Sequence, residues 1–144
     1  MIEIVDVACG LIFSGRFVLV ACRTDGIHLA GHWEFPGGKI EQGETPEQCL
    51  KRELKEEFTI ESEVGEFVAE SIFDYGDKRI RLLAYKVKHL SGEFQLIDHD
   101  EIRWLPIEEL DSLKWAPADL PIIEALKLIE NPGVMFKAYE PGFL

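Results

Sequence analysis

The chain has 144 residues, of which 47% are hydrophobic and 29% charged, a composition typical of one soluble globular domain with a sizeable core. Its 27 acidic residues outnumber its 15 basic ones and give a net charge of -12, which argues against binding to duplex nucleic acid or to an anionic membrane surface. An anionic ligand would therefore need a cation to mediate its contact with the protein.

Local sequence signals predict an α+β chain. Runs rich in β-branched residues predict strands at residues 2–13, 16–23, 64–75, 78–90 and 101–106. Thr45 followed by Pro46 predicts the start of a helix that runs to about residue 58, and apolar spacing predicts a second helix over residues 120–130. The segment 24–33 reads as a loop and "PGG" as a turn. Strands and helices are mixed without a βαβ rhythm, so we expect a mixed sheet with helices on both faces.

We expect one domain at residues 1–130, followed by a tail at 131–144 that docks on the domain, meets a partner subunit or is flexible. The cysteines, Cys9, Cys22 and Cys49, are odd in number and widely spaced, which predicts reduced thiols of a cytoplasmic protein. Glu3 and Asp6 interrupt the apolar N-terminal run, so no signal peptide is expected. No apolar run reaches membrane-spanning length. A monomer and a homodimer are both consistent with the sequence.

Three glutamates share one face of the predicted first helix. At about 100° per residue, Glu53, Glu56 and Glu57 form a contiguous arc beside the apolar stripe of the helix. Glu53 and Glu57 are like charges at i,i+4, and carboxylates near a helix C-terminus oppose the helix dipole. Arg52 can reach Glu56 at the favourable i,i+4 spacing. A salt-bridged, solvated face explains this crowding poorly, whereas a divalent cation would remove both penalties, and oxygen ligands favour Mg²⁺ or Mn²⁺.

The loop before this helix supplies further candidates. Gly37 and Gly38 permit close backbone approach. Lys39 is placed to touch a phosphate, and Glu44 to brace the loop against Arg52. A Gly-Gly turn in isolation indicates only a turn, so the glycines are candidate site residues only together with the carboxylates that follow them.

The segment "GKIEQGETPEQCLKRELKEEFTI" (38–60) resembles the Nudix box, Gx5Ex7REUxEExGU, in which U is aliphatic. Both "WEFPGGK" before the box and "WAPADLPIIEAL" after it resemble the MutT-like branch, which includes 8-oxo-dGTP and CTP pyrophosphohydrolases. The resemblance covers most of residues 1–130 and implies an α/β/α sandwich around a mixed sheet. The chain departs from the box at Thr59, where the box has glycine. A β-branched residue adopts the left-handed conformation at a cost of about 1–2 kcal/mol, so we expect the helix to end differently, with the threonine hydroxyl helping to satisfy a carbonyl.

The resemblance implies a metal site and a reaction. Glu53, Glu56 and Glu57, with the carbonyl of Gly37 or Gly38, would hold Mg²⁺, for which Mn²⁺ can substitute, against a di- or triphosphate. Family members attack a phosphoanhydride with water, and MutT-like members act at the β-phosphorus to give a nucleoside monophosphate and pyrophosphate. Such ions neutralise charge on phosphate oxygens and acidify a water.

The implied catalytic residues are Glu53, Arg52 and Glu44, with Glu53 as the first candidate for accepting the proton of the attacking water. In this branch, an acidic residue six positions before the strand tryptophan joins the metal site. Counting back from Trp104 gives Asp98. Two neighbouring residues, Asp100 and Glu101, are alternatives for the same role.

Several residues are candidates for binding the nucleotide. Arg23 matches a position that contacts phosphate or sugar in relatives, although a surface arginine at a strand end fits as well. Phe35 and Trp33 could stack on a base or belong to the core. Lys78 and Arg79 occupy positions where relatives place a cation that contacts base or phosphate.

Asp119, in "APADLP", bears on the choice of base. Relatives specific for 8-oxo-dGTP carry asparagine there, whereas CTP-type relatives carry a similar "APAD" segment. An ionised aspartate only accepts hydrogen bonds, so it favours a base that presents an amino group, such as cytosine. The alternative interpretation is an aspartate that caps the second helix.

The leading hypothesis is therefore an Mg²⁺-dependent nucleoside triphosphate pyrophosphohydrolase that clears non-canonical or surplus nucleotides, leaning towards cytosine-type bases. The alternatives are an 8-oxo-dGTP diphosphatase, a hydrolase of a nucleoside diphosphate derivative such as ADP-ribose, and a Nudix-fold sensor without activity. The intact set of three glutamates argues against the sensor.

Overall fold

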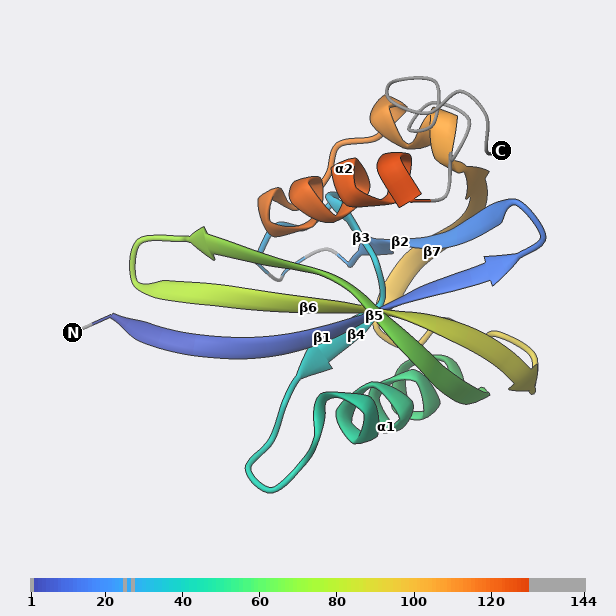
Figure 1. The fold of residues 1–144 in the computed structure, drawn as a ribbon, viewed down its shortest axis with the longest axis horizontal. Helices are drawn as coiled ribbons and strands as arrows, with labels where there is room; N and C mark the ends of the chain where they lie inside the picture. Colours follow the sequence, from blue (N-terminus) through green and yellow to red (C-terminus); the bar gives the residue numbers. More distant parts are fainter. Residues whose placement is uncertain (1, 25, 27, 130–144) are drawn as a thin grey trace, which may run out of the picture.

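A mixed sheet forms the centre of the protein (Figure 1). The computed structural model describes residues 2–24, 26 and 28–129, so the tail predicted at 131–144 lies outside the described residues. The described strands are β1 (Glu3–Ser14), β2 (Phe17–Arg23), β3 (Trp33–Glu34), β4 (Gly37–Lys39), β5 (Glu61–Asp74), β6 (Lys78–Ser91) and β7 (His99–Pro106). β1 pairs in parallel with β6 and antiparallel with β2 and β4, while β5 and β7 lie antiparallel to β6 and β2. The predicted mixed sheet is confirmed.

Two helices cover opposite faces of this sheet (Figure 1). The first is α1 (Pro46–Phe58), with the predicted bounds, and the second is α2 (Leu120–Ile129), preceded by short 3-10 turns at Ile107–Ser112 and Pro117–Asp119. Successive strand residues point to opposite faces, so Leu11 packs in the core beneath α2 and Ile12 in the core beneath α1. The result is the predicted α/β/α sandwich. Within the described ranges, no helix combines the length and apolar character that a membrane crossing requires.

The start of α1 is fixed locally. The Thr45 hydroxyl accepts the Gln48 N–H at 3.0 Å, and the Gln48 side chain accepts the Thr45 N–H at 3.0 Å. This reciprocal capping box satisfies two N–H groups that the helix itself cannot pair. The helix therefore begins where the Thr45-Pro46 signal predicts.

Two short strands were not predicted. β3 lies at the end of the expected loop, and β4 occupies the expected Pro-Gly-Gly turn, where Gly37 pairs with Cys9 and Gly38 with Ala8. A Cβ at Gly37 would overlap the carbonyl oxygen of Ala8, so the close approach of β4 to β1 requires glycine. Because glycine is depleted in strands, the residue that permits this pairing also disguises it in the sequence.

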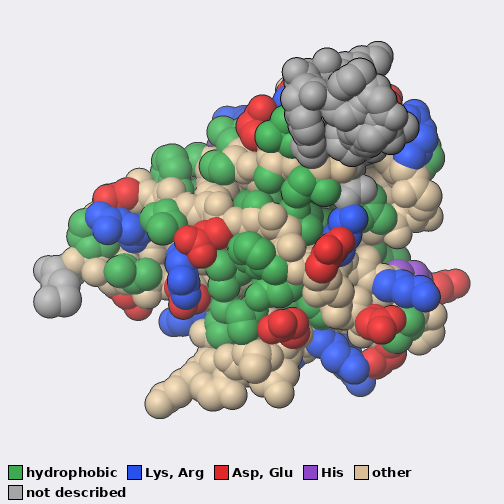
Figure 2. Space-filling view, viewed as in Figure 1, with side chains coloured by type: hydrophobic (Ala, Val, Ile, Leu, Met, Phe, Trp, Pro, Cys, Tyr) green, Lys and Arg blue, Asp and Glu red, His purple; other side chains and the backbone are tan. Residues whose placement is uncertain are grey.

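Charged side chains pair across β1 and β6 where these strands are exposed. On the face drawn in Figure 2, acidic and basic side chains are interspersed around a hydrophobic area. Asp6 and Arg81 are neighbours in the register of β1 and β6, and Arg81 donates two hydrogen bonds of 2.9 Å to the Asp6 carboxylate. This pairing holds the pKa of Asp6 below its ordinary value. Such cross-strand pairs favour the observed register over a slipped one.

The prediction for the end of α1 is wrong. Thr59 adopts the left-handed conformation, with φ 61° and ψ 36°, and its backbone N–H, rather than its hydroxyl, meets the Lys55 carbonyl at 3.0 Å. The Phe58 carbonyl accepts the Gln95 N–H at 3.0 Å, so the segment after β6 closes on the helix end. Tertiary contacts thus hold Thr59 in a left-handed conformation that a β-branched residue adopts only at an energetic cost.

We expect Thr59→Gly to raise the free energy of unfolding by about 0.5–1 kcal/mol, because glycine removes left-handed strain but adds entropy to the unfolded chain. Thr59→Ala, which loses the branched side chain but keeps the Cβ, should gain less. Thr45→Gly is the matched control and should not be stabilised, because Thr45 has φ -77°, which carries no left-handed strain, and its side chain caps the helix. Urea denaturation measures all three, and a destabilised Thr59→Gly variant would contradict the argument.

Candidate functional site

Arg52 organises the carboxylates of α1 and the loop before it. Its Nε and Nη2 donate to the two Glu44 oxygens at 2.6 and 2.9 Å, while Nη1 lies 3.2 Å from Glu53 Oε2 and 3.1 Å from Glu56 Oε1. Glu44 also accepts the Glu41 N–H at 3.0 Å. The Arg52 hydrogen bond lowers the pKa of Glu44 to about 2. The expected brace between Glu44 and Arg52 is present, and it fixes the loop from β4 to α1.

Glu53 lies against the backbone of β4. Its side chain is 16% exposed, and a Cβ at Gly38 would overlap its carboxyl group. Burial, partly offset by Arg52, raises the pKa of Glu53. Glycine at position 38 therefore allows a carboxylate of α1 to reach the main chain of β4, which brings candidate carboxylate and carbonyl ligands together.

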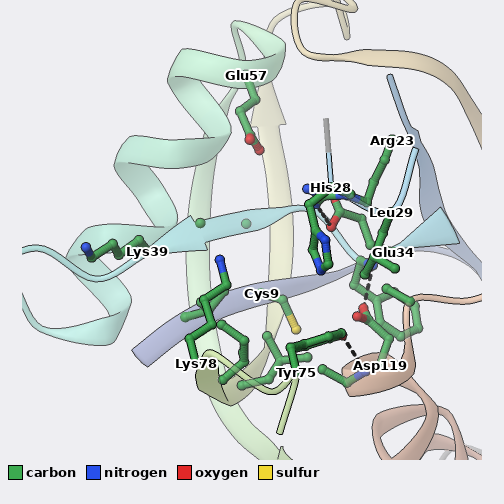
Figure 3. A pocket seen from close by; sticks show the side chains of 18 residues that line it. Cys9, Arg23, His28, Leu29, Glu34, Lys39, Glu57, Tyr75, Lys78 and Asp119 are labelled. Carbon is green, nitrogen blue, oxygen red and sulfur yellow. Dashed lines mark hydrogen bonds and ion pairs between the residues drawn. The ribbon is translucent and has the colours of Figure 1, made fainter. Parts of the chain in front are cut away.

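Glu57 is the most unusual acidic residue of the site. Its Oε1 is buried and has no hydrogen-bond partner among the described residues. Burial first, and then the charges of Glu53, Glu34 and Asp98, raise the pKa of Glu57 to about 9. Its side chain projects from α1 towards β4 (Figure 3). A buried carboxylate that lacks a donor and lies near other acids suits a divalent cation.

The structure gathers only part of the predicted metal set. Glu56 is exposed and pairs with Arg52, and among the described residues no three acidic, histidine or cysteine side chains converge as an assembled metal centre. Glu53 packs against Gly38, and Glu57 lines the same cavity as Gly37 and Gly38, so the candidate donors are all oxygen atoms, the kind that Mg²⁺ uses. The residues present therefore fit a magnesium ion.

Asp98 is best placed of the three alternatives before and in β7. Its charge contributes to the raised pKa of Glu57. Asp100 accepts a 2.6 Å hydrogen bond from the Thr24 hydroxyl, and Glu101 a 2.6 Å bond from Arg103. Asp98 therefore stays the first candidate of the three, since Asp100 and Glu101 are bonded to Thr24 and Arg103.

One cavity of about 230 Å³ joins Glu57 to Asp119 (Figure 3). Its lining includes Gly37, Gly38 and Lys39 from β4, and Phe35, whose N–H donates to Asp119. The rest of its apolar wall consists of Val7, Cys9, Leu29, Ile80, Leu82, Ala116 and Ala118. A polar end beside an apolar pocket suits a phosphorylated ligand with an aromatic or heterocyclic group.

Asp119 is buried at the apolar end. Its Oδ2 accepts the Phe35 N–H at 2.9 Å, so the side chain binds the backbone between β3 and β4 rather than capping α2. Burial and the charge of Glu34 raise the pKa of Asp119 well above its ordinary value. The centroid of the Phe35 ring lies 4.9 Å from that of Trp115. The Arg103 guanidinium carbon lies over the Trp33 ring, 4.6 Å from its centroid.

The predicted cations are placed differently from one another. Arg23, Lys39 and Lys78 line the cavity, whereas Arg79 lies outside the lining and pairs with Asp74 at 3.4 Å. Adjacent residues of a strand face opposite ways, so Lys78 and Arg79 cannot both point into the cavity.

Sequence reasoning did not assign the apolar wall of the cavity to the site, and it also missed three lining residues with polar groups, namely His28, Glu34 and Tyr75. It also missed His99, which is buried and bonds Glu34. Glu34 did carry a signal, because it is an acidic residue between two aromatic residues of an otherwise apolar run.

The chain is similar to known proteins over most of its length. Residues 4–126 match the NUDIX domain family. The chain is 37% identical over 123 residues to the CTP pyrophosphohydrolase of Escherichia coli, covering 85% of this chain and 91% of that protein. It is 37% identical over 126 residues to the 8-oxo-dGTP diphosphatase of Haemophilus influenzae, covering 86% and 92%. The solution structure of the E. coli ORF135 protein superposes with a TM-score of 0.79 at 34% identity, covering 99% and 96%. The chain therefore belongs to the Nudix family, in its MutT-like branch, and is a hydrolase of phosphoanhydride bonds.

Proposed function

We propose that this protein is an Mg²⁺-dependent nucleoside triphosphate pyrophosphohydrolase, with a preference for cytosine-type bases and a role in removing surplus or non-canonical nucleotides. One observation carries the proposal. A single cavity connects Glu57, an acid suited to a cation, with Asp119, an acid suited to reading a base. The named relatives act on CTP or 8-oxo-dGTP according to their names, which supports a nucleotide at this site.

In this proposal the triphosphate lies at the end of the cavity that contains Glu57. Lys39 and Lys78 line the same cavity and would contact phosphate oxygens through their ammonium groups. Mg²⁺ would be held by Glu53, Glu57, Asp98 and the carbonyls of Gly37 and Gly38, while Glu56 stays on the exposed side beside Arg52. The ion would neutralise charge on the phosphates and acidify a water.

Glu53 would accept the proton of the attacking water, because its raised pKa makes it a better base than an ordinary carboxylate. Arg52 would orient Glu53, since Nη1 lies 3.2 Å from it while the opposite edge of the guanidinium is fixed by Glu44. Attack at the β-phosphorus would break the bond between the α and β phosphates, releasing a nucleoside monophosphate and pyrophosphate.

The base would lie beside Phe35, within reach of Asp119. A protonated carboxyl both donates and accepts hydrogen bonds, whereas an ionised one only accepts. Because the pKa of Asp119 is raised, its carboxyl group stays protonated at pH values where an ordinary aspartate is ionised. As pH rises through this raised pKa, the ionised form appears, which only accepts hydrogen bonds and so favours cytosine N4 over uracil O4.

We therefore expect the ratio of kcat/KM for CTP to that for UTP to increase with pH in the wild type. Asp119→Asn should lower this ratio by about tenfold at alkaline pH, the effect of one mismatched hydrogen bond, and should remove its pH dependence. The asparagine oxygen can still accept the Phe35 N–H. Steady-state kinetics from pH 6 to 9 test this, and an unchanged ratio in the variant would show that Asp119 does not read the base.

A second candidate is hydrolysis of 8-oxo-dGTP. The raised pKa of Asp119 favours it, because a protonated carboxyl presents a donor and an acceptor together, as asparagine does. A panel of CTP, dCTP, dGTP, 8-oxo-dGTP and ADP-ribose with Mg²⁺ separates these candidates by kcat/KM. Preference for ADP-ribose over every triphosphate would overturn the proposal, and no turnover of any compound would favour the sensor.

A further inference from the structure

A chain of polar contacts runs from β7 to the nucleotide cavity. His99 is 7% exposed, and its Nε2 lies 2.8 Å from Glu34 Oε2. Glu34 Oε1 accepts a 2.7 Å bond from Arg23 Nη1, and Arg23 Nε donates to the His28 carbonyl at 2.8 Å. Arg23, His28 and Glu34 all line the cavity, but His99 does not. Figure 3 shows Arg23 and Glu34 beside His28.

His99 also contacts the helix that carries the metal candidates. Its ring stacks on Phe58, with centroids 5.2 Å apart and an interplanar angle of 12°. Phe58 is the last residue of α1 and follows Glu57 directly. His99 therefore joins β3, which bears Glu34, to the end of α1.

Packing alone does not explain a histidine here. Its Nδ1 is buried and has no hydrogen-bond partner within the described residues, which costs about 1–3 kcal/mol. Phenylalanine would stack on Phe58 without that cost. The gain from histidine is its Nε2 contact, which holds one oxygen of Glu34 while the other holds Arg23.

We propose that His99 is a positioning residue that fixes Glu34 and, through it, holds Arg23 against the bound nucleotide. Without this contact, Glu34 can rotate away and the Arg23 guanidinium loses its acidic partner on the cavity wall. The inference rests on the proposed function, because Arg23 is taken to bind the nucleotide.

Two substitutions separate the hydrogen bond from the stacking. His99→Phe keeps a ring against Phe58 and loses the contact with Glu34, whereas His99→Gln can donate through its amide and loses the ring. We expect His99→Phe to raise KM for CTP by about tenfold with kcat changed less than about threefold, and His99→Gln to recover most of the loss. Equal KM values for the two variants would overturn the proposal.

A double-mutant cycle identifies the route of the effect. If His99 acts through Glu34 and Arg23, His99→Phe should leave KM unchanged in an Arg23→Ala background, since coupled residues are not additive. A full tenfold increase in both backgrounds would show that His99 acts in another way. Thermal denaturation of each variant checks that the fold is retained.

A measurement without turnover separates this inference from the proposed function. In ¹H–¹⁵N spectra of the nucleotide-free protein, the Arg23 Nε–H should give a resolved, slowly exchanging signal because it is bonded to the His28 carbonyl. His99→Phe should accelerate that exchange at least tenfold, and His99→Gln should do so much less. An unchanged Arg23 signal in His99→Phe overturns the positioning role, whereas a wild type that hydrolyses no triphosphate overturns the proposed function instead.

Discussion

Glu53→Gln is expected to lower kcat for the preferred triphosphate by about 10³-fold, within the usual contribution of a general base. Glutamine keeps the shape that packs against Gly38 but cannot accept a proton from water. Thermal stability should stay near that of the wild type or increase, because burial already raises the pKa of Glu53. Initial rates at saturating Mg²⁺ give the measurement.

The matched control is Glu47→Gln, which removes a charge from an exposed position in the first turn of the same helix and should retain activity within about twofold. If Glu53→Gln retains more than a tenth of wild-type kcat, another group accepts the proton.

Glu57→Gln is expected to abolish activity and stabilise the metal-free protein. The pKa of Glu57 rises from 4.5 to about 9 on folding, so the folded state takes up a proton that the unfolded chain releases above pH 4.5. The contribution of Glu57 to the free energy of unfolding is therefore fully present below pH 4.5, the pKa of the unfolded chain. It is lost as pH rises from 4.5 to about 9, the pKa of the folded protein. Glutamine remains neutral at every pH. The free energy of unfolding of the variant should therefore exceed that of the wild type by roughly 2–3 kcal/mol at pH 7 and nearly equal it at pH 4.5.

Urea denaturation in EDTA at pH 4.5, 7 and 8 tests this sign. Adding Mg²⁺ should raise the Tm of the wild type and leave that of Glu57→Gln nearly unchanged, because a ligand stabilises only the state that binds it. Glu56→Gln is the control for stability in EDTA, since Glu56 is exposed. A Glu57→Gln variant that is less stable than wild type in EDTA at pH 8 would remove the basis for a cation site at Glu57.

The sequence predicted those parts of the structure that depend on local patterns. Both helices and the long strands lie close to the expected bounds, and α1 matches because its cap uses residues three positions apart. The contiguous arc of Glu53, Glu56 and Glu57 likewise follows from helical geometry. The position of Glu56, turned to Arg52 on the exposed side, shows that membership of the arc does not place every carboxylate at the cavity.

Features set by tertiary contact were not predictable. β4 depends on the fit of Gly37 against Ala8, and the left-handed Thr59 depends on a helix end enclosed by a distant segment. The contact between Glu34 and His99 joins residues 65 positions apart, and no local spacing indicates it. Whether a cation lines the cavity from position 78 or 79 depends on a one-residue register that the hairpin sequence does not specify.

The most direct test of the account is hydrolysis of CTP with Mg²⁺ in H₂¹⁸O, followed by mass spectrometry of the products. Attack of water on the β-phosphorus predicts equimolar CMP and pyrophosphate, with ¹⁸O in the pyrophosphate and none in CMP. CDP with inorganic phosphate, or label confined to CMP, would contradict the proposed reaction.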